Sequence, residues 1–371
     1  MAALLADTVV MLADGGVSVF PREAARERFA RYFESVTFLE WSDLEPPAVR
    51  LARSGDLATV RVRRRVRLGT TDSAGRSRLE HTVFAWTETW VREGRGWGIV
   101  QVTSTERAGE RDVAAVERRA DVVAERAAGG GAGPGSDAGG DGSGPADPPV
   151  TATAAAPTPE QILARARDAV EDLPGASVDS VRAVSFVSAG SSPDGPFRTA
   201  VRSGRDGGIS LAQRTSAGEV VRREAGPLGG AADRGGAPPS AAADRAFLQG
   251  HALLHLALDP AAVLGPPVRA GRMTFAGVPA DVVVFRDGAG HPLELAHDRG
   301  TGRLLGGRLR NPADPGEVIL LYLSGWRVAD GLLLPRRAAY LQGDELYLHR
   351  LEEVRLNPPE GGSPAGTPGR P

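Results

Sequence analysis

The sequence of 371 residues contains no cysteine and no lysine, and its only asparagines are Asn311 and Asn357. Without cysteine the chain has no disulfide, no thiolate nucleophile and no cysteine-based metal site. All 44 basic residues are therefore arginine. Lysine and asparagine codons are AT-rich, so this bias indicates a GC-rich genome rather than selection for phosphate contacts. The net charge of −2 likewise gives no field that would favour nucleic acid.

Long apolar runs are also missing. No run is longer than Val318–Leu323, which is far short of the roughly 20 residues that a membrane helix needs. The first residues lack both a basic start and a long apolar stretch, so no secretory signal is visible. The sequence as it stands predicts a cytoplasmic protein, and a periplasmic or secreted one if residues lie upstream of Met1.

Glycine and proline are abundant, with 48 and 28 residues, and they are concentrated in particular stretches. Their distribution predicts an α+β protein with domains at 1–107 and 159–357. Residues 108–158 are expected to form a charged helix, at about 109–126, and then a disordered Gly/Ala/Pro linker, because such a segment buries too little apolar area to offset its ordering entropy. The linker is expected to let the two domains move independently. Residues 358–371 are expected to be a disordered tail.

The first domain shows the pattern of a curved antiparallel sheet with one helix on its concave side, which together make a cone. A helix is expected from Pro21 to about Phe33, with proline near its first turn. The long alternating strands are expected at Leu57–Leu68, Glu80–Arg92 and Gly96–Thr105.

Two charges are expected inside this cone. Alternation along the first long strand turns Arg61, Arg63, Arg65 and Arg67 toward solvent and leaves Arg64 on the apolar face. On the next strand Glu88 shares a face with Trp86 and Trp90. An unpaired buried charge costs several kcal/mol, on the order of a whole domain's net stability. We therefore expect Arg64 and Glu88 to form an ion pair within the cone.

Several segments of the first domain resemble the SnoaL-like branch of the NTF2-like superfamily. They are Leu5–Val10, the helix from Arg22, Gly55–Ala58, Trp86–Trp90 and Trp97–Val100. The resemblance implies an α+β cone used for isomerisation, cyclisation, ligand binding or dimerisation. Members open with a long helix, whereas this chain starts where that helix should end; either the start is too late or residues 109–126 take its place. Because Glu88 is the only inward acid, and is expected to be neutralised, no catalytic residue is predicted.

The second domain shows the pattern of two helices and a meander of strands. In Val318–Leu323 both strand faces are apolar, so both must be covered, one by the core and the other by a cavity or a helix. A helix expected at 240–258 has an apolar stripe suited to a lid. The residues expected to line a ligand cavity are Phe247, His251, Leu254, Leu258, Leu320, Tyr322 and Trp326.

Three segments of this domain resemble the LolA/LppX-like lipoprotein carriers. They are His291–Leu305, Gly325–Pro335 and Val354–Asn357. The resemblance implies an open antiparallel half-barrel with a helical lid in its mouth, which in the carriers holds acyl chains.

Histidine spacing offers little for a metal. His251 and His255 are four residues apart on the expected helix, but no third ligand is apparent, so neither a metal nor a cofactor is predicted.

The sequence favours a non-catalytic protein that binds a lipid or another apolar molecule in the half-barrel, with the cone as a second pocket or a homodimerisation module. Two alternatives stay open, namely a SnoaL-like isomerase or cyclase acting on a hydrophobic molecule, and a structural interaction protein without a ligand.

Overall fold

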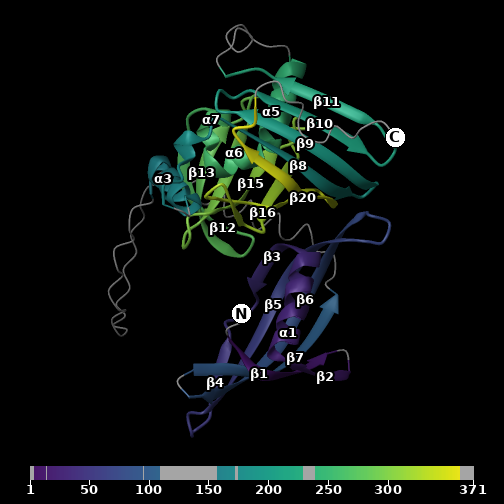
Figure 1. Ribbon diagram of the computed structural model, residues 1–371, viewed down its shortest axis with the longest axis vertical. Coiled ribbons are helices and arrows are strands. Elements are labelled where there is room, and N and C mark those ends of the chain that lie inside the picture. The colour runs from purple at the N-terminus through teal and green to yellow at the C-terminus, as the bar shows by residue number, and fades with distance from the viewer. Residues whose placement is uncertain are drawn as a thin grey trace, which may run out of the picture.

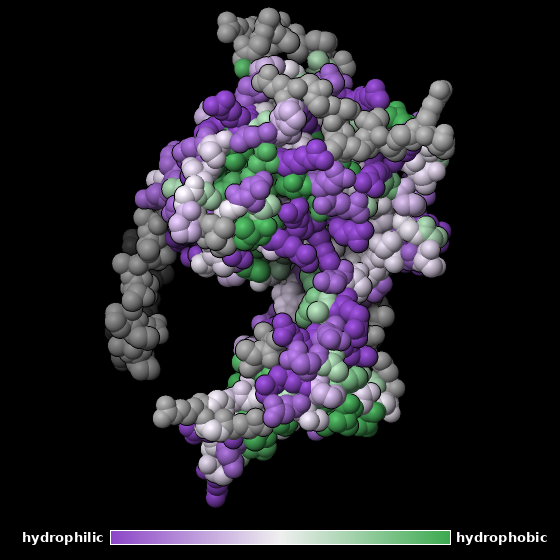
Figure 2. Space-filling model, in the orientation of Figure 1, coloured by the Kyte–Doolittle hydropathy of each residue, from purple (hydrophilic) through white to green (hydrophobic). Residues whose placement is uncertain are grey.

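The computed structural model describes residues 4–13, 15–94, 96–108, 157–171, 174–228 and 239–359. These residues form two lobes joined at a narrow waist (Figures 1 and 2). Each lobe has its own sheet, and the longer sheet is open at both ends of its strand order. The fold is thus α+β, rich in strands, without a closed barrel in the described part. The expected linker, the helix at 109–126 and most of the tail lie outside the described residues.

The N-terminal lobe is a seven-stranded sheet with one helix on its concave face (Figure 1). Its strand order is β2-β1-β7-β6-β5-β3, and β4 pairs with β5. Its elements are β1 (Leu5–Ala13), β2 (Gly16–Pro21), α1 (Arg22–Ser35), β3 (Thr37–Asp43), β4 (Ala48–Leu51), β5 (Leu57–Thr71), β6 (Ser77–Glu93) and β7 (Gly96–Ala108). The sequence predicted α1 and the three long strands, but it did not predict β2, β3 and β4.

The turn between β5 and β6 shows why this hairpin forms where the sequence predicts it. The Asp72 carboxylate accepts hydrogen bonds from the backbone N–H groups of Ala74 and Arg76, at 2.9 and 3.0 Å. Gly75 adopts φ +78, which a side chain would disfavour. These contacts, the Arg76 backbone N–H first, lower the pKa of Asp72 to about 2. The turn therefore fixes the register of the whole hairpin.

The C-terminal lobe is an eleven-stranded antiparallel sheet that curves around its helices (Figure 1). Its strand order is β11-β10-β9-β8-β20-β19-β16-β15-β14-β13-β12, and a separate hairpin pairs β17 with β18. The helices are α3 (Pro159–Val170), the 3-10 turn η2 (Val178–Ser180), α5 (Pro239–His251), α6 (Leu253–Leu258) and α7 (Pro260–Leu264). The strands are β8 (Ala183–Ser192), β9 (Gly195–Gly204), β10 (Ile209–Thr215), β11 (Val220–Ala225), β12 (Arg269–Phe275), β13 (Val278–Arg286), β14 (Pro292–Asp298), β15 (Leu304–Arg310), β16 (Val318–Ser324), β17 (Arg327–Ala329), β18 (Leu332–Leu334), β19 (Arg337–Gln342) and β20 (Glu345–Leu356).

The single helix expected at 240–258 is two helices. Ala252, with ψ 45, interrupts the helical backbone between α5 and α6. The two helices differ in burial: all six residues of α6 are buried and all but His255 are apolar, whereas α5 has half-buried residues in its first turns. α6 therefore enters the core, and α5 stays near the surface.

Both faces of β16 are covered, as its sequence requires. Leu321 and Leu323 pack into the core around the helices, whereas Leu320 and Tyr322 belong to a second apolar cluster on the opposite face. Leu39 of the N-terminal lobe is fully buried in this second cluster. The outer face therefore meets the other lobe, which the sequence did not predict, and its Leu320 and Tyr322 line a cavity there, which is one of the two covers that the sequence predicted.

Direct contacts join the two lobes, which the sequence had predicted to move independently. Arg337 of β19 donates hydrogen bonds to three carbonyls at the C-terminal end of α1, including those of Phe33 and Val36 at 2.9 Å. α1 has no basic residue in its own last turn. Because a cation stabilises the negative end of a helix dipole, the second lobe completes a helix of the first.

A second contact lies where the β12–β13 turn meets β3. The Trp41 N–H donates to the Ala276 carbonyl at 3.3 Å. Gly277 follows at φ +83, and a Cβ there would come within 2.4 Å of the Trp41 carbonyl oxygen. Only glycine allows this close approach of the two backbones.

Candidate functional site: a groove beneath α5

A groove of about 240 Å³ lies between α5 and the concave face of the large sheet. Strands β9, β10, β15, β16, β19 and β20 form its floor and walls. Its lining residues are Phe197, Gln213, Ala246, Phe247, Gly250, His251, Leu309, Arg310, Pro312, Ile319, Tyr340, Gln342, Tyr347 and His349. The groove is thus mainly aromatic and aliphatic, with a few polar groups, which is the usual make-up of a small-molecule site.

Stacked rings form one wall of the groove. The His251 ring lies 4.3 Å from the ring of Phe247 and 5.0 Å from that of Tyr340, between ring centres. The His349 ring meets Tyr340 at 5.4 Å in an edge-on arrangement. The Tyr340 hydroxyl donates to the Gly250 carbonyl at 2.9 Å, which ties this wall to the end of α5.

Both histidines of the groove are neutral at pH 7. Burial, and then the neighbouring His251, lowers the pKa of His349 to about 3. Burial also lowers the pKa of His251. His349 shares a 3.1 Å hydrogen bond with the Ser188 hydroxyl, which fixes its ring. Among the described residues that line the groove, Arg310 is therefore the only one with a charged side chain, so most of the lining suits an uncharged or weakly polar guest.

The two ends of α5 are held differently. At its C-terminal end the Gln249 amide donates to the Val263 carbonyl at 2.6 Å and accepts from the Gly288 N–H at 2.6 Å. Further back, Arg223 of β11 pairs with Asp244 and lies over the Phe247 ring, 4.7 Å from its centre. The second set of contacts is partly exposed and weaker, which fits a lid anchored at His251 and looser at its start.

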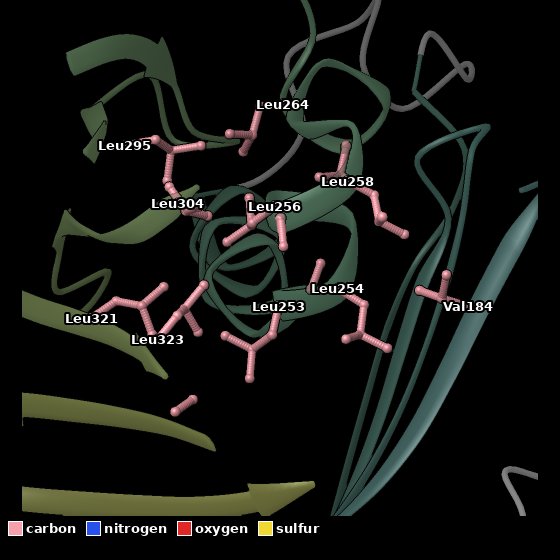
Figure 3. Packing of buried hydrophobic residues seen from close by; sticks show 14 of the residues in the cluster. Val184, Leu253, Leu254, Leu256, Leu258, Leu264, Leu295, Leu304, Leu321 and Leu323 are labelled. Carbon is pink, nitrogen blue, oxygen red and sulfur yellow. The ribbon is translucent and has the colours of Figure 1, made fainter. Parts of the chain in front are cut away.

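The residues predicted to line one cavity separate into three places. Phe247 and His251 line the groove. Leu254 and Leu258 do not; they belong to the buried core cluster around α6, against which Trp326 packs. Figure 3 shows leucines of α6 surrounded by Leu295, Leu304, Leu321 and Leu323 from the sheet. Leu320 and Tyr322 lie on the opposite face of the sheet, because alternation along β16 turns them away from Leu321 and Leu323.

Sequence reasoning missed several residues of the groove, above all His349. The signal was the alternation in β20, where Tyr347 and His349 share one face and both line the groove. Tyr340 was missed although it lies directly opposite Tyr347 in the β19–β20 ladder.

The predicted ion pair inside the N-terminal lobe is wrong. Arg64 pairs with Asp43, its neighbour across β3 and β5, and its guanidinium lies 5.3 Å from the ring centres of both Trp41 and Trp86. Glu88 instead accepts hydrogen bonds from the indole N–H groups of Trp86 and Trp90, each at 3.0 Å.

The reason for this error is register. Glu88 lies opposite Val60 and Arg64 lies opposite Phe84, so the two charges are four residues apart along the ladder. That spacing is about 13 Å at the rise of a strand. Counting outward from the turn at Asp72 would have shown it.

The break at Ala252 also separates the two histidines that are four residues apart. His255 is buried and shares a 2.7 Å hydrogen bond with the Ser203 hydroxyl, while burial lowers its pKa to about 4. Within the described residues no group of three metal-ligating side chains comes together. None of the described helices has the length and apolar content needed to cross a membrane.

Comparisons with known proteins find solved structures that are similar to parts of this chain. The sequence matches no family model and no curated protein. Toward the N-terminus the chain is similar to an NTF2-like protein of unknown function in nutrient uptake from Rhodospirillum rubrum, at 24% identity and a TM-score of 0.22, over 28% of this chain and 78% of that one.

A larger region is similar to two further solved structures. One is a DUF1329 family protein from Desulfovibrio piger, with 10% identity, a TM-score of 0.29, and 55% of this chain and 93% of that one covered. The other is a domain classed as an outer membrane lipoprotein-sorting protein from Vibrio parahaemolyticus, with 9% identity, a TM-score of 0.30, and coverages of 55% and 94%. The chain is thus similar to NTF2-like proteins in its N-terminal part and to lipoprotein-sorting proteins over a larger region.

Proposed function

We propose that this protein is a non-catalytic binding protein that holds a lipid chain or another apolar small molecule in the groove beneath α5. The observation that carries the proposal is the groove's lining, which combines stacked aromatic rings, aliphatic side chains and two neutral histidines. Burial of an apolar guest against such a surface contributes roughly 25 cal/mol per Å².

The size of the groove limits what it holds. Its volume of about 240 Å³ lies below the range of roughly 300–1,000 Å³ common for drug-sized ligands. The α6 leucines fill the rest of the half-barrel, so a guest occupies only the mouth. We therefore propose that a single chain end or one small ring enters, and that outward movement of the first turns of α5 admits anything larger.

The test is a titration of the full chain with N-phenyl-1-naphthylamine, an uncharged apolar fluorophore. Ala246 is buried and lines the groove, so Ala246→Phe should fill it and weaken binding at least tenfold, about 1.4 kcal/mol. Ala241 is exposed on the same helix, and Ala241→Phe is the matched control. Equal binding by the wild type and Ala246→Phe would reject the groove, and no binding by the wild type would favour a purely structural role.

A second candidate function rests on Glu88. Its carboxylate lies among aromatic side chains and is held by two indole N–H groups, with no ion pair found for it in the described part of the chain. An acid in such a place suits proton transfer in an isomerase acting on a hydrophobic ketone. The test is conversion of 3-cyclohexenone to its conjugated isomer by absorbance, with Glu88→Gln expected to abolish it and Glu80→Gln, at an exposed position of the same strand, expected to leave it unchanged.

The contribution of the N-terminal lobe as a homodimerisation module remains part of the proposal. The edge strand β2 exposes Val17 and Val19, at 68% and 62%. If this edge pairs two copies, Val19→Asp should convert a dimer to a monomer in light scattering, and a wild-type protein that is monomeric at high concentration would exclude the module.

A further inference from the structure

The contact between the lobes encloses a second pocket, of about 510 Å³. From the N-terminal lobe β3 and β5 contribute Leu39, Glu40, Ser42 and Arg67. From the C-terminal lobe, strands β12, β15, β16 and β19 and the segments that follow β12, β15 and β19 contribute the rest, including Phe275, Arg308, Glu317, Leu320, Tyr322 and Leu341. This pocket, the interlobe pocket, lies on the sheet face opposite the groove beneath α5, so the two sites are separate.

Arg67 is the unusual residue of the interlobe pocket. Its neighbours on the same strand face, Arg63 and Arg65, are exposed, but Arg67 is only 7% exposed. Its Nε is buried without a hydrogen-bond partner, and no ion pair of its guanidinium is found among the described residues. Burying a cation without an acceptor costs folding free energy. The Arg67 guanidinium is therefore a buried charge for which the described residues supply no ion pair.

The nearest acids already have donors of their own. Glu40, opposite Arg67 in the ladder, accepts from the Ser42 hydroxyl at 2.9 Å. Glu317 accepts from the side-chain amides of Asn311 and Gln342, at 2.7 and 2.8 Å. Both carboxylates thus accept hydrogen bonds from neutral groups and keep their charge, and among the described residues neither forms an ion pair with Arg67.

A second arginine and a phenol stand beside Arg67. Burial raises the pKa of Tyr322 to about 12; the charges of Arg67 and Arg308 lower this pKa, and the charge of Glu40 raises it. Both guanidinium groups therefore lie near a neutral hydroxyl that can donate a hydrogen bond. Arg308 is half-buried, and no ion pair is found for it within the described ranges. Within the described residues, two guanidinium groups without an ion pair and one phenol hydroxyl make a place for an anionic oxygen group.

The remaining surface of the pocket is apolar. Leu39, Phe275, Tyr322 and Leu341 belong to the buried cluster between the lobes, and Leu320 packs against it. We propose that the interlobe pocket binds an amphipathic monoanion, a carboxylate with an apolar chain or ring, whose carboxylate is received by Arg67 and Arg308 and whose apolar part lies on this cluster. The proposal does not depend on the groove beneath α5.

The test is calorimetric titration of the full chain with decanoate, and with decanol as the uncharged probe of the same chain length. The wild type should bind decanoate more tightly than decanol. Arg67→Met should weaken decanoate binding roughly ten- to hundredfold, the range for losing a charge-assisted hydrogen bond. Arg65→Met, two residues away on the same strand face and exposed, should bind as the wild type does.

Three further measurements make the outcome decisive. Decanoate should raise the melting temperature of the wild type and not that of Arg67→Met. If Arg67→Met does not fold, Arg308→Met replaces it with the same expectation. Decanoate binding should survive Ala246→Phe, which fills only the groove beneath α5. Decanoate binding that is unchanged in Arg67→Met, lost in Ala246→Phe or absent from the wild type would overturn the proposal.

Discussion

Single charged side chains in the N-terminal lobe are satisfied by neighbours on adjacent strands. Arg64 is held by Asp43 on the neighbouring strand and by the faces of two indole rings. Glu88 is held by the indole N–H groups of the residues two positions before and after it. Each of these two charges is therefore stabilised by nearby side chains, and Arg64 and Glu88 do not pair with each other.

A double-mutant cycle tests this pairing at the level of single residues. Arg64→Met and Asp43→Asn should show a coupling of about 0.5–1 kcal/mol in urea unfolding, since both side chains are partly exposed. The cycle of Arg64→Met with Glu88→Gln is the control and should show coupling within about 0.3 kcal/mol of zero. A large coupling to Glu88 would mean that the two charges meet after all.

Buried histidine gives the protein a predictable response to acid. The pKa of His349 is lowered by burial to about 3, below its unfolded value of roughly 6.5. The unfolded chain therefore binds a proton first as the pH falls below about 6.5, so stability is lost between that pH and the folded pKa, at about 1.4 kcal/mol per pH unit for this residue.

His349→Gln should make the decline of unfolding free energy between pH 6 and pH 4 shallower by up to that amount. Ser188→Ala is the control, because it removes the hydrogen bond to His349 but keeps the titrating ring. It should lower stability at every pH and leave the slope unchanged. Identical slopes for His349→Gln and the wild type would show that this ring is not buried as described.

At the scale of elements, the apolar positions expected on one helix are divided between α5, which covers the groove, and α6, which is buried in the core. The sequence predicted an apolar helix over 240–258, and Phe247 and His251 do face the groove. Leu254 and Leu258 do not, because the chain turns at Ala252 and carries them inside the half-barrel. Helical periodicity identifies apolar positions, but it does not show where a backbone break redirects them.

Leu254→Ala should therefore behave as a core substitution. Leu254 is fully buried, and the change should cost about 2–5 kcal/mol in unfolding free energy. It should leave the affinity for N-phenyl-1-naphthylamine unchanged at temperatures where the variant stays folded. Leu57→Ala, at a 40% exposed position, should cost less than about 1 kcal/mol. If Leu254→Ala lowers the unfolding free energy only slightly but weakens binding of the probe, Leu254 lines the ligand site after all.

At the scale of the whole molecule, the two lobes contact each other directly, and each lobe supplies residues that satisfy or bury groups of the other. Arg337 caps α1 from the opposite lobe, and Leu39 fills the outer face of the large sheet. Strand alternation predicted that both faces of Val318–Leu323 are covered. It could not predict the cover, because docking depends on contacts between residues some 300 positions apart, such as Phe33 and Arg337.

Arg337→Gln should loosen this docking. The loss of three hydrogen bonds to the end of α1 should cost about 1–2 kcal/mol. It should speed amide hydrogen exchange across residues 33–43 and in the turn at 274–277. Arg327→Gln is the control, since Arg327 is 72% exposed and lies 3.9 Å from Glu34. Unchanged exchange in Arg337→Gln would mean that the cap does not hold the lobes together.

The most direct test of a binding role is native mass spectrometry of the full chain purified from a bacterial host, without detergent. Wild-type protein and the Ala241→Phe control should carry a co-purifying apolar molecule that Ala246→Phe lacks, while all three keep the same fold by circular dichroism. A ligand in the groove beneath α5 would be contradicted if the wild-type protein carries no bound molecule in any preparation. It would also be contradicted if Ala246→Phe carries the same bound molecule as the wild type.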